Sequence, residues 1–330
     1  APPTSDPQVA LTLRPRSRMR PGPVSHVRGQ GRVGAIGEHD REYRSNPRSY
    51  MPCKQSEGFM THTHTTYNEA VHAALHLLAD DMGYKIPSHA DIAQERAYLR
   101  ALMNMRDPAP LPDSYREAEA VVLDTERERR ETVTWEDATA SSAHPRIALW
   151  RGDITRLQVD AIVNAANSAM LGCRAPGHTC IDNAIHSAAG LGLRQACADA
   201  MDERARGDDP SGFPTGEALL TPGFHLPARF VIHTVGPIVS GELTQTHREA
   251  LARSYRRCLE EAAALGLDTV AFCCISTGVF SFPQEKAARI AVATVSDFLE
   301  SGTAGTDNLR VIFNVFGDRD EALYHALLGL

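Results

Sequence analysis

The chain has 330 residues, of which 42% are hydrophobic and 23% are charged. This composition can bury a sizeable core and excludes a wholly disordered chain. The sequence holds no apolar run of roughly 18 residues, which excludes a transmembrane helix, and we expect no membrane partner. The net charge of −7 argues against general nucleic-acid binding, but a small phosphate-bearing ligand stays open because backbone N–H groups can bind phosphates.

The first 50 residues differ from the rest in charge and composition. Nine Arg face four acidic residues there, a local charge of +5, so the remainder carries −12. Pro, Gly, Arg and Ser dominate, and we predict a disordered basic tail over 1–50. The stretch Arg14–Arg32 contains six Arg and no acidic residue, which is typical of a solvated tail or of a mitochondrial targeting segment. The sequence begins with Ala1 rather than Met, which leaves its true N-terminus open.

The cysteine content favours a reducing compartment. Seven cysteines are an odd number for a disulfide framework, and they are spread over a long chain that has no signal-peptide apolar region at its start. Thiols in such a setting serve as buried apolar filler, metal ligands or nucleophiles. We therefore expect an intracellular protein, in the cytoplasm unless the Arg-rich segment directs it to mitochondria.

Residues 51–140 are predicted to form a small helical unit. Apolar residues recur at spacings of three and four in the first part of 67–105, which predicts an amphipathic helix. The sequence Ile86-Pro87-Ser88 breaks this helix, and a second one is predicted to follow until the prolines near 110.

From Arg146 onward, short β-branched runs alternate with helical patterns. Strands are predicted at 146–150, 159–164, 217–221, 229–235, 268–275 and 310–316. Helices are predicted at 182–203, 246–265, 283–300 and 318–328. The alternation predicts an α/β domain with a largely parallel sheet over 141–330.

Polar motifs follow the first two of these strands. The sequence Gly152-Asp153-Ile154-Thr155 places an acidic loop at a strand end, a common place for ligand recognition, although Asp153 can also simply cap a turn. In Asn164-Ala165-Ala166-Asn167, two amides flanked by small residues allow close approach of a polar ligand. A turn held by the amide side chains explains this second motif equally well.

The loop that follows carries a possible metal site. Cys173, His178 and Cys180 lie within eight residues, with Pro176-Gly177 between them. Two thiolates and an imidazole suit Zn²⁺, and three protein ligands leave a fourth position open, as in catalytic zinc sites. A chance cluster of buried cysteines is the alternative.

Three further features complete the candidate site. Asp182 begins a predicted helix, where it can act as a base, a fourth metal ligand or a helix cap. The loop Ser276-Thr277-Gly278-Val279-Phe280 joins a strand to a helix and can cradle a diphosphate with backbone N–H groups, or be an ordinary loop. Phe316 ends the last strand, where it can stack on an aromatic base or pack against the sheet.

Taken in order, these segments closely resemble a macrodomain over about 146–330; they read GDIT, VDAIVNAAN, IDNAIHSAAG, FPTGEALLTPGFHLPARFVIHTVGP and CCISTGVFSFP. The loop MLGCRAPGHTC replaces the glycine-rich loop of ordinary hydrolytic macrodomains. It resembles the loop of zinc-containing macrodomains, which also carry a helical N-terminal extension. The resemblance implies a three-layer α/β/α fold with a mixed, largely parallel sheet.

The resemblance also implies a role for each matching position. Asp153 and the backbone of Ile154 would recognise adenine, Asn167 would face the distal ribose, and Cys173, His178 and Cys180 would hold Zn²⁺. Asp182 matches the acidic position of the hydrolytic loop. Ser276, Thr277, Gly278, Val279 and Phe280 would bind the diphosphate and cover the distal ribose, and Phe316 would stack on adenine. Asn183 stands where many relatives have Gly, which leaves the role of Asp182 open.

We therefore predict a monomeric zinc-dependent hydrolase that removes mono-ADP-ribose from modified protein side chains. Its partners would be the ADP-ribosylated protein and ADP-ribose, and Asp182 and Asn167 would be the catalytic residues at C1″ of the distal ribose. The alternatives are a macrodomain that binds ADP-ribose without cleavage, an O-acetyl-ADP-ribose deacetylase, and a hydrolase in which the zinc is purely structural.

Overall fold

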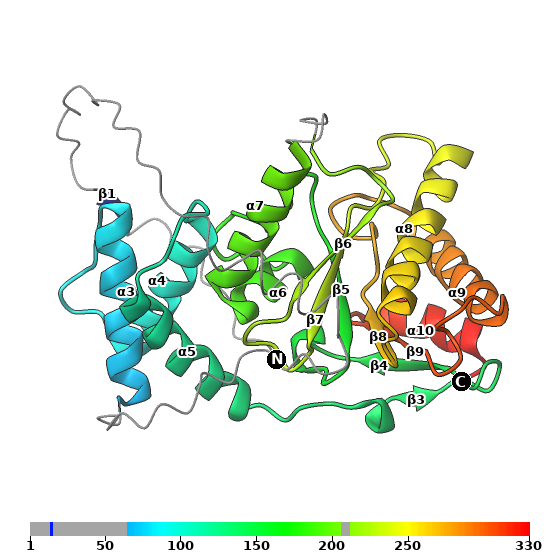
Figure 1. Ribbon diagram of the computed structural model, residues 1–330, viewed down its shortest axis with the longest axis horizontal. Coiled ribbons are helices and arrows are strands. Elements are labelled where there is room, and N and C mark those ends of the chain that lie inside the picture. The colour runs from blue at the N-terminus through cyan, green and yellow to red at the C-terminus, as the bar shows by residue number, and fades with distance from the viewer. Residues whose placement is uncertain (1–13, 16–64, 206–211) are drawn as a thin grey trace.

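The computed structural model describes residues 14–15, 65–205 and 212–330 (Figure 1). The predicted basic tail therefore lies outside the described residues, except for strand β1 (Arg14–Pro15), which pairs antiparallel with β2 (Tyr84–Lys85). Among the described helices, none is both long and apolar enough to cross a membrane.

The described part of the N-terminal region folds into the helices α3 (Tyr67–Met82), α4 (Ile92–Met105) and α5 (Asp113–Glu128). Their apolar faces share a core of their own, and α4 packs against the next domain (Figure 1). Capping boxes at Thr66 and Asp91 explain where α3 and α4 begin. We call these helices the helical extension; its predicted boundary at residue 140 stays a prediction.

Within the described residues, the main sheet has seven strands in the order β3-β4-β9-β8-β5-β7-β6. The five central strands run parallel; they are β4 (Ile147–Arg151), β9 (Arg310–Val315), β8 (Thr269–Phe272), β5 (Ala161–Ala165) and β7 (Phe230–Thr234). The edge strands β3 (Thr139–Ala140) and β6 (Ala218–Pro222) are antiparallel to their neighbours. The prediction of a mixed, largely parallel sheet is confirmed.

Helices cover both faces of this sheet (Figure 1). On one side lie α8 (Gln245–Ala264), α9 (Gln284–Glu300) and α10 (Asp318–Leu328), which contact one another in that order. On the other side lie α6 (Ile181–Ala189) and α7 (Leu191–Ala205), and the helical extension packs outside them. The three-layer α/β/α architecture is therefore confirmed.

The prediction of one helix over 182–203 is wrong, because the chain breaks at Gly190 between α6 and α7. Gly190 adopts φ 88°, a left-handed conformation that favours glycine. The backbone N–H of Leu191, which begins α7, donates to the carboxylate of Glu119 at 3.0 Å. A side chain of the helical extension thus accepts the hydrogen bond of a backbone N–H group at the start of α7.

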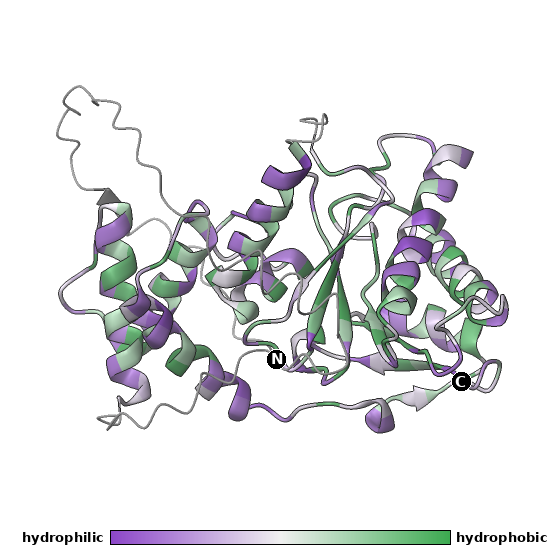
Figure 2. Cartoon of the chain, in the orientation of Figure 1, coloured by the Kyte–Doolittle hydropathy of each residue, from purple (hydrophilic) through white to green (hydrophobic). Residues whose placement is uncertain are grey.

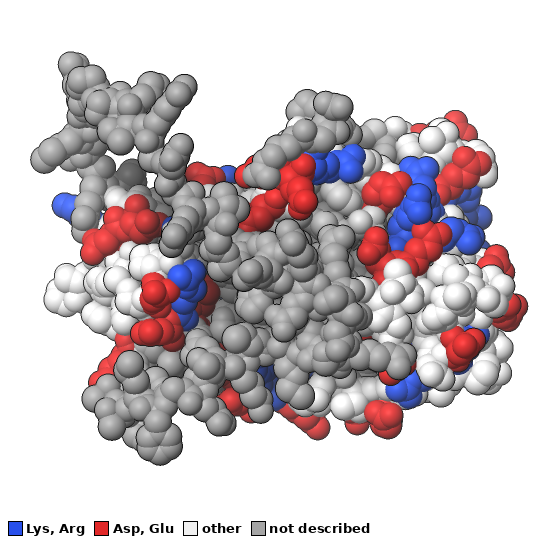
Figure 3. All heavy atoms as spheres, viewed as in Figure 1, with Lys and Arg blue, Asp and Glu red and all other residues white. Residues whose placement is uncertain are grey.

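The central strands are apolar on both faces, as Figure 2 shows for the middle of the molecule. Fully buried polar residues interrupt this pattern, among them Asn164 on β5 and His233 on β7, which stand opposite each other in the sheet register. On the surface, basic and acidic side chains intermingle over α8 (Figure 3), where Arg257 pairs with Glu217 and Glu260. Buried polar side chains in an otherwise apolar sheet indicate a functional site near Asn164 and His233.

Candidate active site

The predicted site residues gather at the edge of the sheet where its parallel strands end. Asp153 follows β4, Asn167 follows β5, the loop 276–280 follows β8, and Phe316 follows β9. Because these strands are parallel neighbours, their carboxyl ends meet at one edge, where α/β folds bind ligands. Segments far apart in the sequence are thus brought into one row.

Asp153 caps the short helix η2 (Ile154–Arg156), as the alternative interpretation proposed. Its carboxylate accepts hydrogen bonds from the backbone N–H and the hydroxyl of Thr155 at 3.0 and 2.7 Å. The other oxygen lies 3.4 Å from the guanidinium of Arg130, and the side chain is 40% exposed. Ile154 is buried, so its side chain is not available to a ligand.

Phe316 does not pack against the sheet, because its side chain is left exposed at the end of β9. It is 62% exposed, and its carbonyl accepts a hydrogen bond from Arg151 at 3.3 Å. An exposed aromatic ring beside the end of β4 is available for stacking on a planar ligand.

The loop 276–280 turns back sharply after β8. Ser276 has φ 65°, and its carbonyl accepts from the backbone N–H of Phe282 at 3.0 Å. Within the described residues, the backbone N–H groups of 277–280 donate to no other backbone group. They are therefore free to bind an anion.

Gly236, which follows β7, is a residue that the sequence analysis did not single out. A Cβ atom there would lie 2.1 Å from the hydroxyl oxygen of Ser276. Ser276 is buried, and its hydroxyl has no hydrogen-bond partner in the described residues. Only glycine permits this close approach between the two loops.

The loop 171–180 brings the three predicted metal ligands together. The two Sγ atoms of Cys173 and Cys180 and a ring nitrogen of His178 all lie within 4.8 Å of one another, and Cys173 Sγ is 3.4 Å from His178 Nδ1. Two ligands of one tetrahedral zinc ion lie about 3.5 Å apart, given bonds of about 2.0–2.3 Å. The residues therefore fit a divalent metal ion, and the half-buried to exposed setting leaves an open side.

Cys180 is also the N-cap of α6, where its Sγ accepts a hydrogen bond from the backbone N–H of Asn183 at 3.4 Å. Burial raises the pKa of Cys180 to about 12, against the lowering effect of that N–H group. Coordination to a cation deprotonates a thiol. A cation bound at this position would therefore hold Cys180 as the thiolate.

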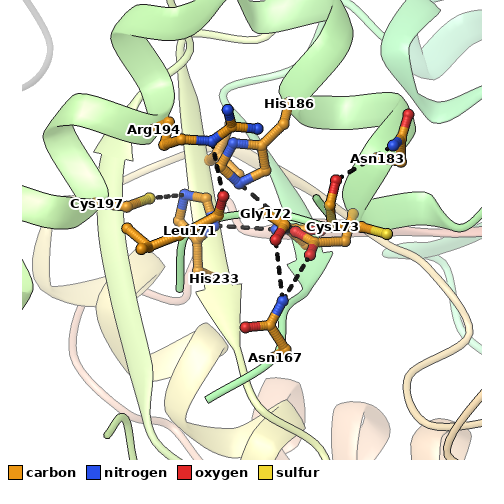
Figure 4. Close-up of polar contacts among 12 residues, drawn as sticks. Asn167, Leu171, Gly172, Cys173, Asn183, His186, Arg194, Cys197 and His233 are labelled. Carbon is orange, nitrogen blue, oxygen red and sulfur yellow. Dashed lines mark hydrogen bonds and ion pairs between the residues drawn. The ribbon is translucent and has the colours of Figure 1, made fainter. Parts of the chain in front are cut away.

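Asp182 is buried and held by two amides, one of them that of Asn167, which Figure 4 labels at the bottom of the view. Asn164 Nδ2 donates to Oδ1 at 2.8 Å, and Asn167 Nδ2 donates to Oδ2 at 3.2 Å. Asn167 Nδ2 also donates to the carbonyl of Gly172 at 3.2 Å, which connects Asp182 to the loop 171–180. Burial raises the pKa of Asp182 to about 6, although the two amides and Arg194 lower it.

The sequence analysis missed His233, which continues this hydrogen-bond chain into the core. Asn164 Nδ2 lies 3.1 Å from His233 Nδ1, and His233 Nε2 lies 2.9 Å from the hydroxyl oxygen of Thr221. Burial lowers the pKa of His233 to about 3, so the ring is neutral. Since the amide donates to Nδ1, the ring proton sits on Nε2. The signal was a histidine in the otherwise largely apolar run FVIHTV.

His186, Cys197 and His233 form a second, fully buried group of metal-ligating side chains (Figure 4). Both ring nitrogens of His233 already have hydrogen-bonding partners, which disfavours a metal there. His186 Nε2 lies 3.5 Å from Asp182 Oδ1 without a hydrogen bond, and burial holds the pKa of His186 well below its usual range. His186 is therefore neutral and packs beneath Asp182.

The fold and the site define a three-layer α/β domain in which the candidate ligand-binding residues gather at the carboxyl edge of the parallel strands, beside a loop that carries Cys173, His178 and Cys180. The family model described as Macro domain matches residues 163–291. A protein-ADP-ribose hydrolase of Treponema medium is 44% identical over 249 residues, with 75% of this chain and 92% of that protein covered. The chain belongs to the Macro domain family.

Two other relatives agree with this assignment. A protein-ADP-ribose hydrolase of Staphylococcus aureus is 42% identical, with 68% of this chain and 81% of that protein covered. A solved structure, the Trypanosoma brucei macrodomain in complex with ADP-ribose, is 34% identical with a TM-score of 0.53, covering 67% of this chain and 92% of that chain.

Proposed function

We propose that this protein is a zinc-dependent hydrolase that removes mono-ADP-ribose from modified protein side chains. Relatives of 42–44% identity bear the name protein-ADP-ribose hydrolase, and a similar structure holds ADP-ribose. The observation that carries the metal part of the proposal is the convergence of Cys173, His178 and Cys180 next to Asp182. Binding of ADP-ribose alone needs no such loop.

In this proposal, one end of the carboxyl edge holds the nucleotide. Phe316 stacks on the adenine, Asp153 accepts a hydrogen bond from the adenine amino group, and the backbone of Ile154 assists. The N–H groups of the loop 276–280 bind the diphosphate, as backbone N–H groups at a strand-to-helix turn do elsewhere. These contacts position the bond to be broken.

At the other end, Asn167 faces the distal ribose and Asp182 acts as the general base. The carboxylate of Asp182 is fixed by two amides, so its orientation is set before substrate binds. Cys173, His178 and Cys180 would hold zinc, which supplies either a Lewis acid or a bound water of lowered pKa when it is present. The bond broken joins C1″ of the distal ribose to a side-chain atom of the modified protein.

The test is release of free ADP-ribose from a mono-ADP-ribosylated protein by the variants Cys173→Ala and His178→Ala. Loss of a metal that contributes several kcal/mol of transition-state stabilisation lowers turnover about 10³-fold. Affinity for ADP-ribose, measured by calorimetry, should stay close to wild type. His89→Ala is the matched control because His89 is exposed like His178 but lies in the helical extension.

Each alternative gives a different result in this assay. A domain that only binds ADP-ribose would release none of it in the wild type. A deacetylase would prefer O-acetyl-ADP-ribose over the modified protein. If the zinc is purely structural, chelation would lower the unfolding temperature before it changed the activity of the folded protein, and equal turnover in Cys173→Ala would contradict a catalytic zinc.

A further inference from the structure

The loop that carries Cys173, His178 and Cys180 is held from outside by the helical extension. It has no regular secondary structure between β5 and α6. Arg174, in the middle of the loop, donates to the carbonyl of Met105 at 2.5 Å and pairs with Asp107 at 2.7 Å. Both partners lie at the carboxyl end of α4, so this end of α4 contacts the loop directly.

Arg194 of α7 makes a second connection between the same two segments (Figure 4). Its Nε donates to the carbonyl of Leu171 at 2.8 Å, at the start of the loop. Its Nη1 donates to the carbonyls of Met103 and Arg106, where α4 ends. Arg194 is 2% exposed, and a buried guanidinium that satisfies the last carbonyls of a helix fixes that helix end firmly.

Asn183 is the central connection. Its side-chain Nδ2 lies 3.3 and 3.2 Å from the carbonyls of Cys173 and Ala175, on either side of Arg174. Its backbone N–H donates to the sulfur of Cys180. One fully buried residue therefore contacts the loop at both of its cysteine ligands.

The Asn183 side chain is itself fixed by α4. Its Nδ2 also donates to Asn104 Oδ1 at 3.0 Å, and its Oδ1 accepts from Arg100 at 3.2 Å. Asn104 Nδ2 donates to the hydroxyl oxygen of Ser187 at 3.0 Å, and that hydroxyl donates to Asn183 Oδ1 at 3.2 Å. Asn104, Asn183 and Ser187 thus close a ring of buried hydrogen bonds between α4 and α6.

We propose that α4 of the helical extension sets the geometry of loop 171–180, with Asn104 and Asn183 as positioning residues, and thereby sets the affinity of the loop for its metal. Groups outside the ligands orient the ligands, and their loss typically costs about 10- to 100-fold in metal affinity. The helical extension would then support the metal site directly, because α4 positions the loop that carries the ligands. The statement about affinity rests on the proposed function, whereas the statement about loop geometry does not.

The first test is titration of the metal-free full-length chain with Co²⁺, followed by the thiolate-to-cobalt absorption band. Asn104→Ala should weaken Co²⁺ binding by about 10- to 100-fold. Asp124→Asn is the matched control, since it removes a different contact of the extension, the 3.0 Å pair with His225, far along the chain from the loop. The control should bind Co²⁺ as tightly as the wild type.

A second variant and a second measurement separate positioning from loss of folding. Arg174→Ala changes an exposed residue, so it should fold like the wild type. Hydrogen exchange in metal-free protein should become faster in 171–176 for both Asn104→Ala and Arg174→Ala, with β5 still protected. Unchanged exchange and unchanged Co²⁺ affinity in both variants would overturn the proposal.

The two proposals fail in different ways. If the wild type binds no Co²⁺, the metal part of the proposed function is wrong, and the exchange rates still decide whether α4 orders the loop. If the wild type binds Co²⁺ and cleaves its substrate, but both variants behave like it, only the role of α4 is wrong.

Discussion

At the nucleotide end of the carboxyl edge, which comprises 153–154, 276–280 and 316, the groups available to a ligand are backbone N–H groups, a turn-capping carboxylate and one exposed ring. At the other end, which comprises 167–183 and is called the metal end because the proposed zinc ligands lie there, buried and exposed side chains bond to one another and to the helical extension. The first end can bind with little support from its surroundings. The second needs precise support, because the positions of side chains decide its chemistry.

Substitutions at the two ends should have different effects on KM and kcat. Groups that only hold the nucleotide act equally on the substrate and the transition state, so their loss raises KM and leaves kcat unchanged. Under the proposed function, groups at the metal end act on the reacting bond, so their loss should lower kcat while ADP-ribose still binds.

The largest effect after loss of the metal ligands is expected for Asp182→Asn. The substitution keeps the size of the side chain and removes the base, so kcat should fall about 10²-fold or more. Calorimetric affinity for ADP-ribose should change little. Wild-type kcat in this variant would show that Asp182 is only a structural acceptor for Asn164 and Asn167.

Phe316→Ala should act at the nucleotide end alone. Stacking of a base on an aromatic ring contributes about 1–3 kcal/mol, so KM and the Kd for ADP-ribose should rise about 10-fold, with kcat unchanged. Leu77→Ala is a suitable control because Leu77 is also a partly exposed apolar residue, on α3. A fall in kcat without a change in KM would break the division between the two ends.

Gly172→Ala should damage the metal end through strain. Gly172 has φ 75°, and a Cβ there would lie 2.8 Å from Cγ of His186. Gly241→Ala shares the unfavourable φ, 91°, but its Cβ would meet nothing within 4 Å. Backbone strain alone costs about 1–3 kcal/mol. Thermal unfolding should therefore show a larger loss for Gly172→Ala, and kcat should fall in that variant only.

The smallest effect concerns Glu119, which supports the start of α7 from the helical extension. Burial raises its pKa above 4.5, although hydrogen bonds from Leu191 and Tyr115 oppose the shift. A raised carboxyl pKa means that its stabilisation is complete below about pH 4.5 and is lost as the pH rises through the folded-state pKa. Glu119→Gln should unfold at a higher temperature than wild type at pH 8 and at a similar temperature near pH 4.5. A difference in unfolding temperature that stays constant between pH 4.5 and pH 8 would contradict a raised pKa of the buried Glu119 carboxyl.

Much of the fold could be predicted because its signals are local. The parallel strands are buried on both faces and read as apolar runs, and each predicted strand from 146 onward overlaps an observed one. The many charged residues of α5 obscured its helical pattern in the sequence. Its buried residues include Tyr115, Val122 and Leu123. Strand β3 has two residues, too few to leave a pattern.

The candidate site was predictable where its residues follow one another in the chain. The Cys–His–Cys loop, the loop 276–280 and Asp153 are continuous motifs. His233 was missed because its pairing with Asn164 depends on strand register across 69 residues. Asn104 was missed because it meets Asn183 from 79 residues away. Contacts of this kind arise only when separate elements pack.

Whether zinc held by Cys173, His178 and Cys180 is needed for catalysis can be measured on one preparation of the protein. Metal content and release of ADP-ribose from a mono-ADP-ribosylated protein are determined on the same sample before chelation, after chelation and after return of Zn²⁺. The account predicts stoichiometric zinc, loss of turnover on chelation with the fold and ADP-ribose binding retained, and recovery with Zn²⁺. Full turnover by protein that contains no metal would contradict it.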